Sequence, residues 1–388
     1  MKKITVGIVG IGGFAEITLD DIFASIDKGR DDFEIVASVD PYPQSSKHFE
    51  RLQKMGVPHF ETVKDMYCAH IHPNLCLIST PIQFHTDHIC HCHSHLSSVL
   101  CEKPMTGDID DMWMLEHSDL DCDGFIAIGY QWSYSRAIQA LKKDIMDGVY
   151  GKPAFMKTMV LWPRDKQYFK RSTGWAGKEY ASNGKKILDS VANNATAHYI
   201  HNILYVLGNA VDDSAHVCEV KADLVRTNDI ETFDTCAASF TLDCGAKGLY
   251  IASHSTKNCV NPQFEYRFEK GTVTFSEEQG VIIGKTADGR TIDYGNPFDD
   301  RSKKFFDCID YIKEGKTEVL CGVRAAKAQV EFIAKLHSDN KIYAANPSAV
   351  TEENGALYIC GLDELLEKCY ESEKIPSETD ALSGIAEL

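Results

Sequence analysis

The sequence lacks both a long apolar run and an excess of basic residues. Among its 388 residues, 57 are acidic and 40 are Lys or Arg, so the formal net charge is −17. A nucleic-acid-binding protein needs a basic face to neutralise phosphates, and no Lys/Arg cluster supplies one here. Anionic membranes are disfavoured for the same reason. The apolar runs span only several residues, whereas a membrane-spanning helix needs about 20. We therefore expect neither a nucleic-acid partner nor a membrane partner.

The sequence also lacks Cys-x-x-Cys pairs, although it has 14 cysteines. A strand pattern begins almost at the N-terminus, which predicts that no signal peptide precedes it. A chain of this length can build a large core without disulfides, so we expect a cytoplasmic protein with reduced thiols. The cysteines that lie in apolar runs should act as small buried hydrophobes. These are Cys76, Cys101, Cys236 and Cys308.

Apolar strands alternate with amphipathic helices in the first third of the chain, with strands expected at residues 4–9, 34–39, 75–79, 99–101 and 125–128. This alternation predicts a doubly wound parallel sheet, whose ligands bind where the strands end. From residue 154 onward, strands follow one another through short turns, which indicates a mostly antiparallel sheet. The predicted fold class is therefore α/β. A Rossmann domain spans residues 1–130, and an α+β domain with a large, mostly antiparallel open sheet spans residues 131–388.

Later helices are expected near residues 305–315, 324–337 and 362–370. The segment after residue 370 is acidic and rich in serine, a composition that is typical of a loose tail.

A glycine-rich turn, Gly10-Ile11-Gly12-Gly13-Phe14-Ala15, follows the first strand and opens a helix. In this context the first glycine permits a tight turn, the second lets the backbone approach a pyrophosphate, and the small Ala15 allows close helix–strand packing. The helix N-terminus favours the phosphate charge. An ordinary glycine turn is the alternative interpretation. We predict that a dinucleotide contacts Gly10, Gly12, Gly13, Phe14 and Ala15.

The second strand ends in Asp40, where a carboxylate can accept hydrogen bonds from both ribose hydroxyls. A carboxylate at this position repels a 2′-phosphate, so NAD is favoured over NADP. The nearest cation in the sequence is Lys47, which could blunt that preference.

Another strand leads into Cys101-Glu102-Lys103-Pro104. A buried lysine beside a nicotinamide can exchange protons near neutrality, whereas the alternative is a surface lysine at a strand end. Adjacent strand residues face opposite sides, so Glu102 and Lys103 are not expected to form an ion pair. Pro104 holds Lys103 in an extended conformation and makes their peptide bond a candidate for the cis form.

These motifs together resemble the Gfo/Idh/MocA oxidoreductases, a family named for glucose–fructose oxidoreductase and inositol dehydrogenase. The resemblance spans most of the chain. Besides the motifs above, it rests on Ser79-Thr80-Pro81 followed by His85, on Gly129-Tyr130-Gln131 and on Gly148-x-x-Gly151-Lys152-Pro153. It implies a Rossmann domain followed by a domain whose open sheet often makes oligomer contacts, here a homodimer or homotetramer. It also implies a sugar, cyclitol or related polyol substrate, with Lys103 close to the reacting hydroxyl. The remaining strand-end residues then approach the cofactor (Thr80, Pro81, His85 and Glu102) or the substrate (Gln131).

The family's second catalytic segment is Asp-x-x-x-His, with the two residues one helical turn apart. Asp189 matches the aspartate, but Asn193 stands where the family has its histidine. Asparagine cannot exchange a proton near pH 7, although it can orient a substrate hydroxyl. Proton transfer would then fall to Lys103. His198 is a candidate substrate contact and His201 lies nearby, but on a regular helix both point away from the face of Asp189, so packing is the competing interpretation for both.

The loop after residue 162 combines aromatic and basic residues, which suits a polyol or an acidic sugar. Candidate substrate contacts are Arg164, Tyr168 and Trp175, and packing explains them equally well. The histidine- and cysteine-rich stretch from His85 to His95 has the residue types of a zinc site. The resemblance places it on a helix between two Rossmann strands, so we predict a solvated histidine face and no metal.

The sequence therefore predicts an NAD-dependent oxidoreductase that transfers hydride to or from a sugar or cyclitol hydroxyl or ketone. Two alternatives stay open. One is a redox-neutral enzyme that oxidises transiently, eliminates or isomerises, and reduces again. The other is a non-catalytic dinucleotide-binding regulator, which only the missing histidine supports.

Overall fold

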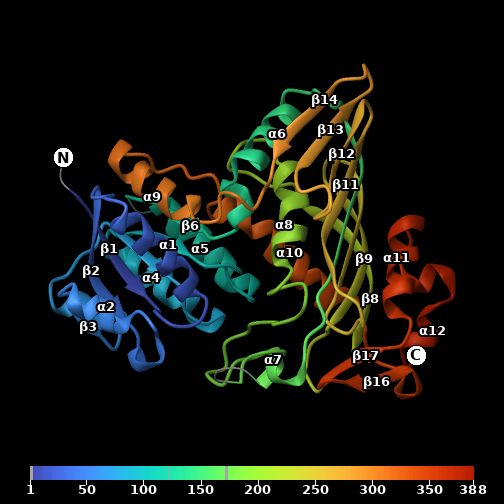
Figure 1. Cartoon of the computed structure of the whole chain (residues 1–388), viewed down its shortest axis with the longest axis horizontal. Helices are drawn as coiled ribbons and strands as arrows, with labels where there is room; N and C mark the ends of the chain where they lie inside the picture. The colour runs from blue at the N-terminus through green and yellow to red at the C-terminus, as the bar shows by residue number, and fades with distance from the viewer. Residues whose placement is uncertain (1–2, 122, 171–173) are drawn as a thin grey trace. The chain divides into compact units, whose positions relative to one another are not determined.

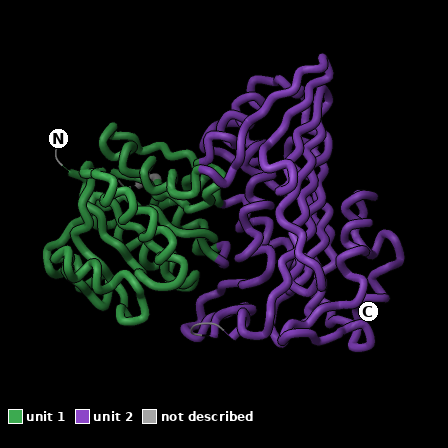
Figure 2. Tube along the Cα trace, in the orientation of Figure 1, with its two compact units in different colours: residues 1–106, 110–134, 300–326 green, residues 107–109, 135–299, 327–388 purple. Residues whose placement is uncertain are grey.

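The computed structural model describes residues 3–121, 123–170 and 174–388. The chain forms two compact units, coloured separately in Figure 2. Unit 1 contains residues 1–106, 110–134 and 300–326, and unit 2 contains residues 107–109, 135–299 and 327–388. The chain thus returns to unit 1 late in the sequence, at residues 300–326. The predicted division, with a single boundary after residue 130, has no such return. Within the described ranges, no helix is long and apolar enough to cross a membrane.

Unit 1 contains a six-stranded parallel sheet in the order β3-β2-β1-β4-β5-β6. The central strands are almost entirely buried and apolar, as expected for a parallel sheet covered on both faces. The strand order reverses between β1 and β4, which is the position where such sheets bind ligands. This topology confirms the predicted Rossmann domain. Its strands are β1 (Ile4–Val9), β2 (Phe33–Val39), β3 (His59–Phe60), β4 (Leu75–Ile78), β5 (Ser98–Cys101) and β6 (Ile126–Ile128).

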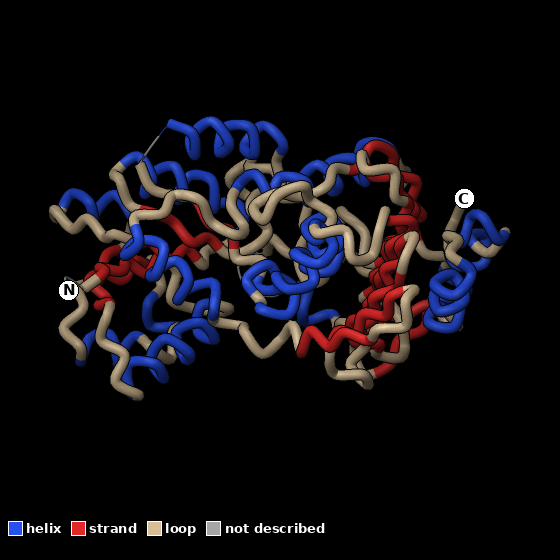
Figure 3. The backbone as a smooth tube through the Cα atoms, turned by 90° about the horizontal axis from the view of Figure 1, so that it is seen from above, coloured by secondary structure: helices blue, strands red, loops and turns tan. Residues whose placement is uncertain are grey.

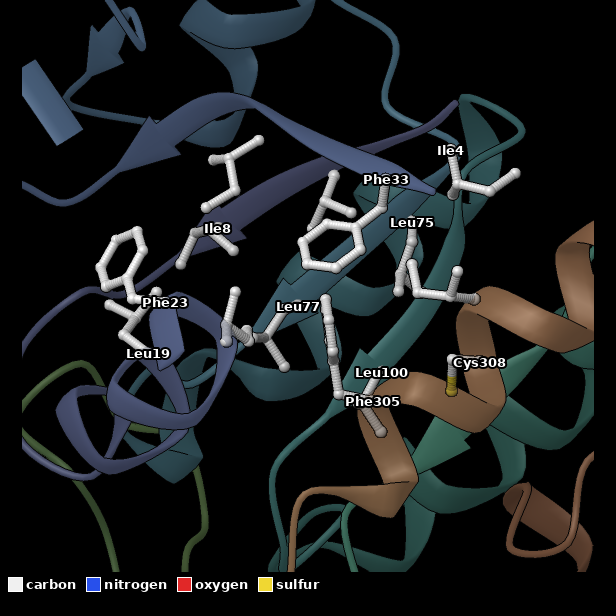
Figure 4. Packing of buried hydrophobic residues seen from close by; sticks show 14 of the residues in the cluster. Ile4, Ile8, Leu19, Phe23, Phe33, Leu75, Leu77, Leu100, Phe305 and Cys308 are labelled. Atoms are coloured by element: carbon white, nitrogen blue, oxygen red, sulfur yellow. The ribbon is translucent and has the colours of Figure 1, made fainter. Parts of the chain in front are cut away.

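Helices from both ends of the sequence complete unit 1. Its core joins Leu19 and Phe23 of the first helix to Phe305 and Cys308 of the ninth, packed against strand residues such as Leu77 (Figure 4). Burying each such large side chain contributes about 1.5–3 kcal/mol. The late return of the chain is therefore an integral part of the Rossmann core. The helices are α1 (Ala15–Asp27), α2 (Phe49–Lys54), α3 (Val63–Cys68), α4 (His85–Ser94), α5 (Ile109–Asp121) and α9 (Lys303–Glu314).

Unit 2 is built on a nine-stranded sheet in the order β14-β13-β12-β11-β7-β10-β9-β8-β15. The β7–β10 and β8–β15 pairs are parallel and the other neighbours are antiparallel, which confirms the predicted sheet type. The strands are β7 (Pro153–Leu161), β8 (Val217–Arg226), β9 (Thr235–Leu242), β10 (Lys247–Ser253), β11 (Val260–Phe268), β12 (Gly271–Phe275), β13 (Ile282–Thr286), β14 (Thr291–Gly295) and β15 (Ile342–Ala344).

Helices cover both faces of this sheet (Figures 1 and 3). On one face, Phe332 packs edge-on against Phe240 and Tyr250. That face carries α6 (Arg136–Met146), α8 (Ala197–Val206) and α10 (Val323–Asp339); the opposite face carries α11 (Leu362–Ser372) and α12 (Leu382–Ile385). The shorter elements of unit 2 are α7 (Lys166–Lys170) and the hairpin of β16 (Val350–Glu353) and β17 (Ala356–Ile359).

The prediction of a loose tail after residue 370 is wrong. Ile375, Leu382 and Ile385 are buried in one cluster with Met159 and Ile251 of the sheet. Most of the acidic and serine residues that suggested disorder are exposed and lie between these apolar ones. Because the tail buries its few apolar residues on the sheet, it is ordered despite its polar composition.

Candidate active site

The glycine turn has the geometry that a dinucleotide requires. Gly10 has a φ of +84°, and a Cβ there would lie 2.8 Å from the carbonyl oxygen of Ser79. Gly13 also has a positive φ, of +60°. A Cβ on Gly12 would meet no atom closer than Ser45 Oγ at 3.5 Å, so the turn is open at this position. The backbone N–H groups at the start of α1 follow directly, so these residues fit the pyrophosphate of NAD.

Asp40 lies at the end of β2 and contacts the glycine turn. Its Oδ2 accepts a hydrogen bond from the backbone N–H of Ile11 at 3.0 Å, and its Oδ1 accepts one from Tyr42 at 2.8 Å. A carboxylate offers about four acceptor positions, so capacity for ribose hydroxyls remains. Lys47, the cation that could weaken the preference for NAD, is paired with Asp20 at 2.7 Å.

Thr80, Pro81 and His85 follow β4 at the same edge of the sheet. His85 is buried, with Nδ1 2.8 Å from the carbonyl oxygen of Pro104 and Nε2 2.8 Å from that of Thr80. Burial lowers the pKa of His85, and these two carbonyl acceptors oppose that effect. His85 thus links the loop after β4 to the loop after β5, which carries Lys103.

The loop after β5 presents Lys103, which is half-buried, through a cis Lys103–Pro104 peptide. As expected, Glu102 faces elsewhere. Its buried carboxylate accepts a hydrogen bond from Lys304 of α9, and the two form an ion pair. No local pattern marks Lys304, which lies 202 residues further along the chain than Glu102. A partner for Glu102 could be expected only on the general ground that a buried carboxylate requires a cation or another hydrogen-bond donor.

Asp189 and Asn193 lie in unit 2, in a series of turns that precedes α8. The expected helical spacing between them is therefore wrong, because the helix begins only at Ala197. Asp189 is buried, and its oxygens accept hydrogen bonds from the Gly177 backbone at 2.7 Å and from the Asn194 side chain at 2.8 Å. The carboxylate thereby joins two loops.

Asn193 is completely buried, and both ends of its side-chain amide are engaged. Its Nδ2 donates to the carbonyl oxygen of Ile187 at 3.0 Å, and its Oδ1 accepts from Gln329 at 3.1 Å. The predicted role of Asn193 in orienting a substrate hydroxyl stays a prediction. In this geometry the amide stabilises the turns that carry Asp189.

A small pocket lies beside Asp189 in unit 2. The predicted residues Tyr168 and Asp189 both line it, together with His254, which follows β10 and which the sequence analysis did not select. No sequence motif marks His254; its proximity to the pocket comes from the pairing of β10 with β7.

The other predicted substrate residues are Arg164, Trp175, His198 and Gln131. The Arg164 guanidinium lies 4.9 Å from the centre of the Tyr168 ring and 5.8 Å from that of Trp162. Trp175 lies in the loop that Asp189 holds through Gly177, and His198 is on α8. Gln131 begins a short 3-10 helix in unit 1. Of the residues predicted after 162, Arg164 and Tyr168 are in mutual contact.

The histidine-rich helix α4 is not simply a solvated face. The ring of Tyr67 stacks on His95 with a centroid distance of 4.1 Å, and His91 stacks on His95 at 4.8 Å. Burial lowers the pKa of His88 to about 4. Among the residues that the structure describes, no group of three or more His, Cys, Asp or Glu could hold a metal ion.

Comparisons with known structures support the same fold over most of the chain. The WlbA dehydrogenase from Bordetella pertussis, solved with NADH and UDP-GlcNAcA, is 21% identical with a TM-score of 0.68, covering 87% of this chain and 96% of its own. The UDP-N-acetylglucosamine 3-dehydrogenase GnnA from Acidithiobacillus ferrooxidans is 15% identical with a TM-score of 0.67, covering 87% and 97%. A levoglucosan dehydrogenase solved with NADH and L-sorbose is 16% identical with a TM-score of 0.67, covering 86% and 98%. At these identities the likeness shows a shared fold.

A comparison with curated protein sequences finds no match. Residues 4–118, in contrast, match the family described as "Oxidoreductase family, NAD-binding Rossmann fold". The matched segment contains the glycine turn, Asp40 and Lys103. The match supports the resemblance seen in the sequence: residues 4–118 are similar to the Gfo/Idh/MocA oxidoreductases, a family with an NAD-binding Rossmann fold.

Proposed function

We propose that the protein is an NAD-dependent dehydrogenase that acts on a hydroxyl group of a sugar, cyclitol or related polyol, or reduces the matching ketone. The observation that carries this proposal is the set of strand-end residues in unit 1. The glycine turn, Asp40 and the Lys103 loop all follow parallel strands at the carboxyl edge of one sheet, where such sheets bind ligands.

Each of these residues has a defined task. The turn at Gly10 and Gly12 binds the pyrophosphate, and Asp40 accepts hydrogen bonds from the ribose hydroxyls. When bound, NAD takes up the hydride from the carbon that carries the hydroxyl. Lys103 accepts the proton of the hydroxyl as the hydride leaves, so the O–H and C–H bonds break together and the ketone forms.

Three observations support a sugar-like substrate. The relatives named above are dehydrogenases of sugars or were solved with sugar-related ligands. Unit 2 has a pocket in which Asp189 and aromatic rings occur together, and polyols bind through such a combination of stacking and hydrogen bonds. Next to it, the guanidinium of Arg164 lies over the Tyr168 ring, a position suited to a carboxylate-bearing sugar.

The test is a paired assay on purified protein. Nucleotide released by denaturation is identified, and NADH formation is followed at about 340 nm with D-glucose, myo-inositol and D-glucuronate. We expect net NADH from at least one probe. Lys103→Ala should then lower turnover by about 10²–10⁴-fold while NAD binding is retained. The exposed Lys64→Ala, on α3 of the same unit, is the matched control and should behave like the wild type.

Other outcomes would contradict parts of this proposal. Near-normal turnover in Lys103→Ala would remove the lysine from the reaction. Tightly bound NAD without net NADH from any probe would contradict the dehydrogenase proposal and favour a redox-neutral or regulatory protein, which product analysis by mass spectrometry would separate.

A further inference from the structure

Arg164 follows β7 in unit 2 and is half-buried. Strand β7 pairs in parallel with β10, with Leu161 opposite Ser253, so the residues after the two strands emerge at the same edge of the sheet. The backbone N–H of Arg164 donates to the carbonyl oxygen of His254, which directly follows β10, at 3.0 Å. His254 lines the small pocket of unit 2, together with Tyr168. The backbone of Arg164 is thereby fixed next to this pocket.

The guanidinium of Arg164 has no anionic partner in the protein. Within the described ranges it forms no ion pair with an Asp or Glu side chain, and its Nε is buried without a hydrogen-bond acceptor. The adjacent Asp165 is exposed, and its Oδ1 accepts from the Tyr168 N–H at 2.9 Å. In a chain with 57 acidic residues, a half-buried cation that none of them neutralises indicates a site for an anion from outside the protein. The arginines that do pair with carboxylates include Arg30, Arg51, Arg267, Arg290 and Arg301.

Two aromatic rings accompany the Arg164 guanidinium. Its Cζ lies 4.9 Å from the centre of the Tyr168 ring and 5.8 Å from that of Trp162. Trp162 is itself fixed, because its Nε1 donates to Oδ1 of Asn261 at 3.0 Å and its ring lies edge-on to Tyr199. A guanidinium that packs on rings still directs its N–H groups along its own plane, where they can bind an anion. The rings therefore position the cation without neutralising its charge.

The neighbouring lysines favour a carboxylate over a phosphate as the anion. Lys166 pairs with Glu352 at 2.7 Å, and Lys178 pairs with Glu231 at 2.9 Å. A phosphate monoester carries about two negative charges near pH 7 and is commonly bound by a cluster of cations. A carboxylate carries one charge, and its two oxygens match the fork of a single guanidinium. One unpaired guanidinium beside paired lysines therefore fits a carboxylate.

We propose that the substrate is a sugar acid and that Arg164 binds its carboxylate. This inference rests on the proposed function, because it names the class of polyol that the enzyme oxidises. The carboxylate is bound and is not changed: the oxidised hydroxyl lies elsewhere on the same molecule, and no bond to the carboxylate forms or breaks. A neutral sugar leaves the guanidinium without an acceptor, so it binds more weakly.

The test is isothermal titration calorimetry of the full chain with NAD present, using D-glucuronate and D-galacturonate. Their neutral counterparts, D-glucose and D-galactose, are titrated in parallel. We expect at least one acid to bind about 10–100-fold more tightly than its neutral counterpart, as is typical of charge-assisted hydrogen bonds. Arg164→Gln should remove most of this difference and leave the binding of the neutral sugar almost unchanged. Arg164→Lys keeps the charge but loses the fork, so its preference for the acid should be intermediate.

Controls separate a carboxylate contact from a packing role. Arg290 is 60% exposed and pairs with Asp288 at 2.9 Å, so Arg290→Gln is the matched control and should bind both sugars like the wild type. If Arg164 only packs, Arg164→Gln should weaken acid and neutral sugar equally, which would overturn the proposal. A preference for the acid that survives in Arg164→Gln, or no binding of either acid, would also overturn it. D-Glucose 6-phosphate that binds more tightly than both acids would overturn the assignment of a carboxylate.

A spectroscopic readout observes the guanidinium directly. In protein labelled with ¹⁵N-arginine, the Nε–H signal that is missing from Arg164→Lys should shift when the bound acid is added. The same signal should stay in place with the neutral counterpart. A signal that responds equally to both sugars would contradict the carboxylate contact.

Failure of this inference is distinguishable from failure of the proposed function. If the wild type forms NADH from a neutral sugar and Arg164→Gln does so equally, Arg164 is excluded and the dehydrogenase function stands. If an acid binds through Arg164 but no sugar yields NADH, the carboxylate contact is supported and the dehydrogenase function fails.

Discussion

The buried ion pair between Glu102 and Lys304 gives a quantitative test of how unit 1 is assembled. The side chains are 8% and 3% exposed, and the Lys304 ammonium also lies 3.4 Å from the carbonyl oxygen of Gly129. Lys304→Met removes the charge and leaves the Glu102 carboxylate buried without its cation. Breaking a buried pair in this way costs about 3–5 kcal/mol, a large fraction of the roughly 5–15 kcal/mol that stabilises a typical protein.

The double variant Glu102→Gln/Lys304→Met tests the reason for that cost. Replacing both members of a buried pair by neutral groups is often close to neutral, so the double variant should recover most of the lost stability. The neighbouring Lys303 pairs with Asp307 on the same helix and is 30% exposed. Lys303→Met is therefore the matched control and should cost only about 0.2–0.5 kcal/mol.

The assay is urea denaturation followed by circular dichroism, combined with hydrogen exchange of the peptides that contain β5 and α9. The pair joins these two elements, so Lys304→Met should increase exchange in both. A loss below about 1 kcal/mol, typical of an exposed pair, would refute the reasoning. A double variant as unstable as the single one would also refute it, because the cost would then not come from an unpaired carboxylate.

Four further predictions concern other parts of the chain. Asp40→Ala should weaken NAD binding and relax the discrimination against NADP; titrations with both dinucleotides check this, and an unchanged preference would remove Asp40 from the ribose. Arg164→Gln should raise KM for D-glucuronate more than for D-glucose, and equal effects in paired kinetics would contradict a carboxylate contact. The hydrogen bond that His216 donates to the Glu331 carboxylate raises the pKa of His216, so this pair stabilises unit 2 below the ordinary histidine pKa of about 6.5, and the stabilisation is lost as the pH rises through the raised value. His216→Gln should flatten that part of the stability–pH curve, whereas an unchanged curve would contradict the assignment. Removal of residues 362–388 should expose the apolar cluster on the sheet and cause self-association, so an unchanged elution volume in gel filtration would contradict the covering role of this segment.

Local patterns in the sequence predict the parts of the fold that depend on nearby residues. The run ending at Val9 and the glycine turn after it need only neighbouring residues to form a strand, a tight turn and a helix. The approach of Asp40 to Ile11 follows from the parallel pairing of two adjacent strands. The buried positions of Cys76 and Cys101 likewise follow from the apolar residues around them.

Long-range contacts account for what the sequence does not predict. Lys304 reaches Glu102 across 202 residues, and no local pattern distinguishes it from the more exposed Lys303 beside it. The tail after residue 370 has the composition of a disordered segment, because composition does not record that Ile375 and Leu382 bury against the sheet.

The contrast between local and long-range contacts also applies to position 193, where asparagine stands in place of the family's histidine. Asn193 lies in a turn whose amide bonds to Ile187 and Gln329, and its side chain is completely buried. A titrating imidazole at this position would have to give up or rearrange these bonds in an interior that disfavours charge. Asn193→His should therefore lower the midpoint of urea denaturation without raising turnover in the NADH assay. A rise in turnover would instead show that position 193 reaches the substrate.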